Sequence, residues 1–339
     1  MAETKYFTDD NLNAAAPQHN TSLTLAYRTF GDPKNPAVLL PSCYSGKIGN
    51  TLTFLYLDKE DAPVLRDYYV IVCGLLGGSE SSSPSNVPDQ IQGPRFPKIT
   101  YEDNIKLQHK LCLSLGITRL HAYMGFSMGG QQAYTMATLF PDFVERIVVL
   151  AGSARTSWHN WSFLEGPKAA LVNSVDFHDG NYQTPASRGT RAFSRVYATW
   201  ALSQAWFRER SWETLGFRDL EEYLRVAWEG GQGAWDAHDL LAMIYTWQNG
   251  DISKLSIIPE AERGDLPKAL ASIKAKALIM PSRSDFYFPP EDSAEEVVHL
   301  KRGELRVIQS IWGHFAGGGG GTKADNEFIK QEVKRFLAT

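Results

Sequence analysis

The sequence predicts an α/β fold: a doubly wound, mostly parallel sheet interrupted by a helical insertion. Short apolar runs rich in β-branched residues alternate with helical stretches over the first part of the chain. The alternation then stops for roughly 110 residues, where aromatic, helix-like segments replace the strands. It resumes at Lys276. Alternating strands and helices build a parallel sheet with right-handed crossovers.

Six runs are expected to form strands that are buried on both faces, because each is almost wholly apolar. They are PAVLLP (36–41), YVIVC (69–73), LHAYM (120–124), RIVVL (146–150), KALIM (276–280) and ELRVIQ (304–309). The earlier stretch SLTLAYRTF (22–30) alternates between apolar and polar residues, which predicts an antiparallel edge hairpin. Helices are predicted over 101–115, 130–140 and 325–337.

The insertion predicts a helical cap domain. We therefore divide the chain into a first core segment at 1–155, a cap at 156–266 and a second core segment at 267–339. Eight of the nine tryptophans lie between Trp158 and Trp247. We expect helix packing to be their main role. A substrate-facing role for some of them is the alternative.

Composition argues against several classes of protein. A formal net charge of −4 provides no electrostatic footprint for nucleic acid or for an anionic membrane. No apolar run approaches the ~18 residues that a membrane span needs, and the first ten residues lack the apolar core of a signal peptide. Cys43, Cys73 and Cys112 form no C-x-x-C pair. We therefore expect a cytoplasmic protein with reduced thiols and no metal site.

The sharpest motif is GFSMG at 125–129, between an apolar run and a predicted helix. In this setting G-x-S-x-G places the serine on a strained strand-to-helix turn, and its neighbours must be small. The motif predicts that Ser127 is the nucleophile of an α/β-hydrolase fold. It also places the N–H of Met128 at a helix N-terminus, where it can bind an oxyanion. A chance match is the alternative.

A serine nucleophile needs a base, and the base needs an orienting acid. In this fold both follow the nucleophile on loops after later strands, the acid first. Asp285 follows the run ending at 280, and His314 follows the run ending at 309. We predict that they are the acid and the base. For Asp285, a surface carboxylate or a helix cap remains an alternative.

A second oxyanion donor is expected from the loop after 36–41. Tyr44 is our preferred donor, and Cys43 is the alternative. Cys43, Phe126, Phe286 and Phe315 flank the catalytic positions, so we expect them to line an apolar pocket. Five consecutive glycines, Gly317–Gly321, predict a flexible loop, with a mobile edge of the active site as the alternative.

The chain resembles the homoserine O-acetyltransferase family of α/β-hydrolase-fold enzymes. The resemblance rests on GLLGGS (74–79), FPKITYED (96–103), LGI (115–117), GFSMGG (125–130), SDFYFPP (284–290) and GH (313–314). It implies a helical cap, a triad of Ser127, Asp285 and His314, and a homodimer formed through cap helices.

One departure from that family bears on the substrate. In the acetyltransferases an aspartate follows the catalytic histidine and holds the amino group of homoserine, whereas here Phe315 follows His314. A neutral ring cannot pair with an ammonium as a carboxylate does. The oxyanion loop, Ser42-Cys43-Tyr44, also lacks the family's histidine-led pattern. Homoserine is therefore not the expected substrate.

The predicted function is a serine hydrolase that cleaves an ester, thioester or lactone through an acyl-enzyme on Ser127, on a small apolar substrate or a secondary metabolite. An O-acyltransferase that uses acetyl-CoA or another acyl-CoA as co-substrate is the first alternative. A non-catalytic binding protein on the same scaffold is the second. No cofactor is expected.

Overall fold

The structure is a computed structural model, which describes residues 2–9, 22–58, 63–78 and 80–339. In these ranges the chain forms an eight-stranded sheet with the order β1-β2-β4-β3-β5-β6-β7-β8. β2 is antiparallel to both of its neighbours, and β3 to β8 are mutually parallel. The strands are β1 (Lys5–Asp9), β2 (Leu23–Phe30), β3 (Ala37–Pro41), β4 (Tyr69–Cys73), β5 (Ala122–Phe126), β6 (Arg146–Leu150), β7 (Lys276–Met280) and β8 (Gly303–Leu305).

This architecture confirms the predicted fold class, with differences in detail. β5 lies two residues later than the predicted 120–124. β1 was not predicted, because its sequence KYFTD carries no apolar run and lies half-exposed at the edge of the sheet. β8 is shorter than the predicted 304–309. The chain leaves the ladder after Leu305 and makes one more bridge, between Ile308 and Ser282.

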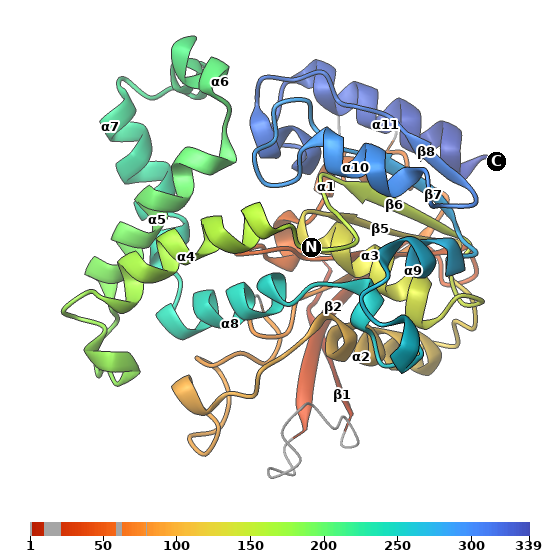
Figure 1. Ribbon diagram of the computed structural model, residues 1–339, viewed down its shortest axis with the longest axis horizontal. Helices are drawn as coiled ribbons and strands as arrows, with labels where there is room; N and C mark the ends of the chain where they lie inside the picture. Colours follow the sequence, from red (N-terminus) through yellow and green to blue (C-terminus); the bar gives the residue numbers. More distant parts are fainter. Residues whose placement is uncertain (1, 10–21, 59–62, 79) are drawn as a thin grey trace.

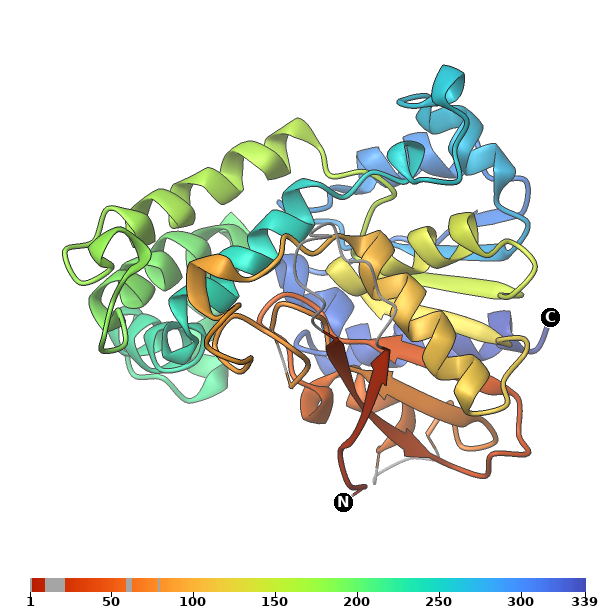
Figure 2. The same ribbon diagram turned by 90° about the horizontal axis from the view of Figure 1, so that it is seen from below.

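Both faces of the sheet are covered by helices. Successive residues of a strand point to opposite faces, so Leu39 and Leu40 are both fully buried but belong to different cores. Figures 1 and 2 show how the helices lie around the sheet. Residues of α2 (Tyr101–Ser114), α3 (Met128–Leu139) and α9 (Leu266–Ser272) fill one core, and residues of α11 (Lys323–Leu337) fill the other.

A second group of helices stands to one side of this core (Figure 1). Within it, α4 packs against both α5 and α8. α9, by contrast, lies against α3 in the core, and the division of the chain into domains stays a prediction. The group comprises α4 (Trp158–Val172), α5 (Ser187–Ala201), α6 (Gln204–Arg208), α7 (Leu220–Tyr223) and α8 (Ala237–Gln248), with a π-helical turn at Leu224–Glu229. We refer to α4–α8 as the cap.

The remaining elements are short. α1 (Thr53–Tyr56) follows β3, and α10 (Pro290–Val297) lies between β7 and β8. Two 3₁₀ helices, Gln232–Ala234 and Gly313–Gly318, come close to the site described below. Over the described ranges, no helix combines the length and the apolar character that crossing a membrane requires.

Candidate active site

Ser127 lies on a strained turn between β5 and α3. Its backbone angles are φ 59° and ψ −125°, outside the regions that L-residues ordinarily occupy. The turn is held by the Ser127 N–H, which donates to the carbonyl of Leu150 on β6, and by the Ser127 carbonyl, which accepts from Gly130 and Gln131. Strain of this kind persists only where the surroundings impose it, and it clusters at functional sites.

The glycines of the motif are required by close approaches of the backbone. A Cβ added to Gly125 would meet the carbonyl group of Gly129, and one added to Gly130 would come within 2.9 Å of Val149 Cγ1. The turn therefore tolerates no side chain at these positions. The glycines on either side of Ser127 therefore allow the tight turn that holds the serine.

His314 and Asp285 come together from loops after β8 and β7. The distance between His314 Nδ1 and Asp285 Oδ2 is 2.7 Å, and both side chains are buried. Asp285 Oδ1 accepts from the backbone N–H groups of Tyr287, at 2.7 Å, and Phe288, at 3.2 Å. The carboxylate is therefore fixed at both oxygens. It caps no helix, since the N-cap of α10 is Pro289 without a side-chain bond.

Aromatic rings enclose the His314 imidazole. Ring centroids of Phe126, Tyr287 and Phe288 lie 4.5, 4.8 and 5.6 Å from its centroid. Phe126 immediately precedes Ser127, so the ring that contacts the imidazole comes from the strand that ends at the predicted nucleophile. This packing restricts how the imidazole can turn.

Three backbone N–H groups near Ser127 have no acceptor among the described residues. They belong to Met128, the first residue of α3, and to Cys43 and Tyr44 in the loop after β3. β3 and β5 are neighbours in the sheet, so the two groups of donors come from adjacent strand ends. These are the positions from which the sequence predicted oxyanion donors.

A cavity of about 730 Å³ opens over these residues. Of the residues predicted from the sequence, Ser127, His314, Cys43, Tyr44, Phe126 and Phe315 line it. Phe286, a predicted pocket residue, does not; the next residue, Tyr287, does. The Cys43 residue is only partly buried, but burial of its thiol raises the pKa to about 12. The thiol is therefore protonated and a poor nucleophile.

The cap supplies much of the cavity wall. Two of its tryptophans, Trp228 and Trp235, line the cavity, while Trp206 and Trp247 are fully buried in the helix packing. The Phe315 ring stacks on Trp228 with centroids 5.7 Å apart. Apolar and polar residues that sequence reasoning did not place here also line the cavity, namely Leu52, Tyr197, Leu215, Phe217, Tyr223, Lys47 and Gln232.

Part of the glycine run is closely packed, and the flexible loop stays a prediction. Gly317 and Gly318 belong to a 3₁₀ helix, and Gly318 lines the cavity. A Cβ on Gly318 would come within 2.7 Å of the Phe126 ring, and one on Gly317 within 2.8 Å of the Ala151 Cβ. Gly319 has a φ of 86°, which favours glycine. At Gly318 the chain passes directly over Phe126, which leaves no room for a side chain.

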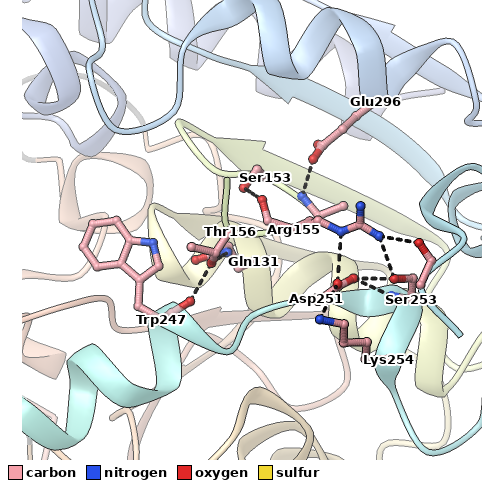
Figure 3. A network of polar contacts seen from close by, with 11 residues as sticks. Gln131, Ser153, Arg155, Thr156, Trp247, Asp251, Ser253, Lys254 and Glu296 are labelled. Carbon is pink, nitrogen blue, oxygen red and sulfur yellow. Dashed lines mark hydrogen bonds and ion pairs between the residues drawn. The ribbon is translucent and has the colours of Figure 1, made fainter. Parts of the chain in front are cut away.

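A polar network joins the cap to the core beside the nucleophile helix (Figure 3). Arg155 donates from Nε to Asp251, at 3.0 Å, and from an Nη to Ser253. The two segments that connect the cap to the core also pair through one backbone bond, which the Thr156 N–H donates to the Gly250 carbonyl at 2.8 Å. The hydroxyl of Thr156 accepts from Gln131 on α3, in the turn after Ser127. The Thr156 hydroxyl in turn donates to the carbonyl of Trp247 on α8, so Thr156 connects the cap to the helix that follows the nucleophile.

Over the ranges that the structure covers, no group of three or more His, Cys, Asp or Glu side chains is placed to hold a metal ion. All three cysteines are free.

The comparison with known proteins agrees with this architecture. The family model described as alpha/beta hydrolase fold matches residues 36–318, and the chain belongs to this family. An ethyl acetate hydrolase of Pseudomonas veronii is 32% identical over 83% of this chain and 80% of its own length. The solved structure of the acetyl esterase MekB has a TM-score of 0.92 and 28% identity, and the match covers 99% of this chain and 97% of that one.

A homoserine O-acetyltransferase of Methanosalsum zhilinae is 28% identical over 93% of this chain and 70% of its own length. The predicted resemblance to that family is therefore confirmed, with esterases among the similar proteins as well. The prediction of an α/β-hydrolase-fold enzyme is confirmed too.

Proposed function

We propose that the protein is a serine esterase, in which Ser127 is the nucleophile, His314 the base and Asp285 the orienting acid. One observation carries the proposal: the strained Ser127 lines a single cavity with His314, whose Nδ1 lies 2.7 Å from the buried Asp285 carboxylate. The similarity to an ethyl acetate hydrolase and an acetyl esterase supports ester cleavage.

In the proposed reaction, His314 Nε2 takes the Ser127 proton while Oγ attacks the carbonyl carbon of the ester. Asp285 holds the proton on Nδ1 and stabilises the imidazolium that forms. The N–H groups of Met128 and Tyr44 bind the oxyanion, and the loss of one such donor typically costs about 3–4 kcal/mol of barrier. The imidazolium then protonates the leaving alcohol. A water molecule, deprotonated by His314, releases the acid from Ser127. The reaction requires no cofactor.

Water, not an amino-acid alcohol, is the proposed acceptor. The position where homoserine acetyltransferases carry an aspartate is Phe315, and its ring is stacked on Trp228. In the described part of the chain, no carboxylate lines the cavity. An acceptor ammonium would therefore be desolvated against aromatic rings without a counter-charge. The same wall suits a small, mainly apolar acyl or aryl ester, including esters of secondary metabolites.

The proposal is tested with Ser127→Ala and, as a control, Ser187→Ala, which changes an exposed serine on α5 outside the cavity. We expect para-nitrophenyl acetate hydrolysis and fluorophosphonate labelling to be lost in the first variant and kept in the second. Mass spectrometry should find the acyl group on Ser127. Turnover of acetyl-CoA that requires an added alcohol would instead establish an acyltransferase.

We also propose a homodimer formed through the cap helices. Trp158, with 85% of its surface exposed, and Trp161 and Val196 present apolar surface on the neighbouring helices α4 and α5. Burial of such surface between two copies is favourable. Sedimentation at micromolar concentration should report twice the chain mass, and a monomer would refute the pairing.

A cytoplasmic location is proposed from the three free thiols. Fractionation of the source cells tests it, and recovery outside the cytoplasm would contradict it.

A further inference from the structure

The wall of the active-site cavity includes a polar cluster, called here its polar end, besides its aromatic residues. Two segments build this end and touch at two points. Gln232 Nε2 lies 3.4 Å from Ser45 Oγ, and Lys47 Nζ lies 5.4 Å from the centre of the Trp235 ring. The cavity residues that form this end are Ser45, Lys47, Asn50, Thr51, Gln232 and Trp235.

Lys47 provides the positive charge at this end of the cavity. It is the one Lys, Arg, Asp or Glu among the residues found to line the cavity. In the described ranges its ammonium lies over the Trp235 ring and forms no ion pair, although the Glu80 carboxylate accepts from the N–H of the next residue, Ile48, at 3.1 Å. A single cation beside a wall of low dielectric attracts anions into the cavity and repels ammonium groups.

Gln232 provides a second, independent indication of a ligand. Its side chain lines the cavity although the residue is only 7% exposed. One end of the amide faces Ser45, and Oε1 at the other end has no hydrogen-bond partner in the described structure. Buried polar groups nearly always have a partner.

The oxygen and the NH₂ group of a glutamine side chain can exchange positions when the amide group rotates. If Gln232 turns over, the Ser45 hydroxyl donates to Oε1, and the NH₂ group becomes the free end. That end is buried in the described structure, so the Gln232 side chain has to rotate toward the cavity before a carboxylate can accept from both Gln232 and Lys47.

We propose that this end of the cavity binds a carboxylate carried by the substrate, so that the preferred substrate is an ester with an anionic far end. The inference rests on the proposed esterase function. Lys47 follows the proposed oxyanion donor Tyr44 by three residues, which span at most about 10 Å. Esters with one benzene ring or a short aliphatic chain between the carboxylate and the ester carbonyl are therefore suitable probes.

The carboxylate can belong to either half of the ester, and matched substrates distinguish the two. For the alcohol half, para-acetoxybenzoate is compared with the neutral para-acetoxybenzamide. For the acyl half, the mono-para-nitrophenyl ester of glutaric acid is compared with para-nitrophenyl pentanoate. The readout is the ratio of kcat/KM for the anionic ester to that for its neutral counterpart. We measure it in the wild type, Lys47→Met and Gln232→Leu.

Lys98→Met is the matched control. Lys98 is also an exposed lysine over an aromatic ring, with Nζ 5.3 Å from the Tyr245 centroid, but it does not line the cavity. Its ratios should equal those of the wild type. Thermal unfolding of each variant shows that it is folded.

We expect the ratio to fall about three- to tenfold in Lys47→Met and in Gln232→Leu, through KM, for at least one of the two substrate pairs. The pair that responds identifies the half of the ester that carries the carboxylate. Added salt should lower the ratio in the wild type but not in Lys47→Met. Ratios that stay within about twofold of the wild type in both variants, for both pairs, would overturn the inference. Hydrolysis of the neutral esters by the wild type tests the proposed function separately.

Discussion

Replacement of Asp285 by asparagine tests the proposed mechanism, because the surrounding backbone determines how the new amide must lie. Asp285 Oδ1 accepts from the N–H groups of Tyr287 and Phe288. An NH₂ group at the position of Oδ1 would face these two N–H groups, and none of the three could accept a hydrogen bond. The asparagine therefore keeps its oxygen there and turns its NH₂ toward His314 Nδ1, which now has to accept. The ring proton moves to Nε2, and the imidazole can no longer take the proton of Ser127.

The size of the effect follows from this change of tautomer. In a serine protease the same substitution lowers kcat by about 10⁴, which corresponds to about 5 kcal/mol of barrier. We expect a loss of this order in kcat for para-nitrophenyl acetate. KM should change little, because Asp285 does not line the cavity. Stopped-flow or long-time hydrolysis assays measure the residual rate, and urea unfolding verifies that the fold is kept.

The control is Asp142→Asn. Its carboxylate is 83% exposed and 2.9 Å from Lys274, and exposed pairs of this kind contribute about 0–1 kcal/mol. This variant should keep wild-type activity. If Asp285→Asn kept more than about a tenth of the wild-type kcat, Asp285 would not be the residue that sets the tautomer of His314.

Two further predictions concern stability. Gly318→Ala should lower the free energy of unfolding by about 1–3 kcal/mol and reduce kcat/KM, because the new Cβ would come within 2.7 Å of the Phe126 ring. Gly320→Ala is the control, because its Cβ would lie 3.4 Å from Phe315, and neither quantity should change. Equal urea midpoints and activities would show that the run is not tightly packed. Burial raises the pKa of Glu296, which accepts from the Ala154 N–H at 2.8 Å, to about 8. Between its ordinary pKa of 4.5 and about 8, Glu296 is protonated in the folded state but ionised in the unfolded state. The free energy of unfolding should therefore fall as the pH rises through this range, by at most about 1.4 kcal/mol per pH unit. Glu296→Gln should flatten this slope in urea unfolding between about pH 5 and about pH 8, and parallel profiles for the two proteins would contradict the assignment.

The sequence alone predicted the features that short-range physics controls. The parallel strands carry continuous apolar runs because both of their faces are buried, as Leu39 and Leu40 show. The turn at Ser127 could be recognised because its steric requirements fall on Gly125 and Gly130, within three residues of the serine. The half-exposed strand β1 had no such signal and was missed.

Tertiary structure decided which side chains face the cavity. Tyr287 lines it and Phe286 does not, because in a loop the direction of a side chain depends on long-range contacts and not on a period of two or 3.6 residues. The packing of Gly317 and Gly318 depends on Phe126, almost 200 residues earlier in the chain. Gln232 meets Ser45, and Trp235 meets Lys47, only because the chain between α7 and α8 lies against the loop after β3. Contacts between such distant segments leave no local pattern in a single sequence, so they appear only once the chain is folded.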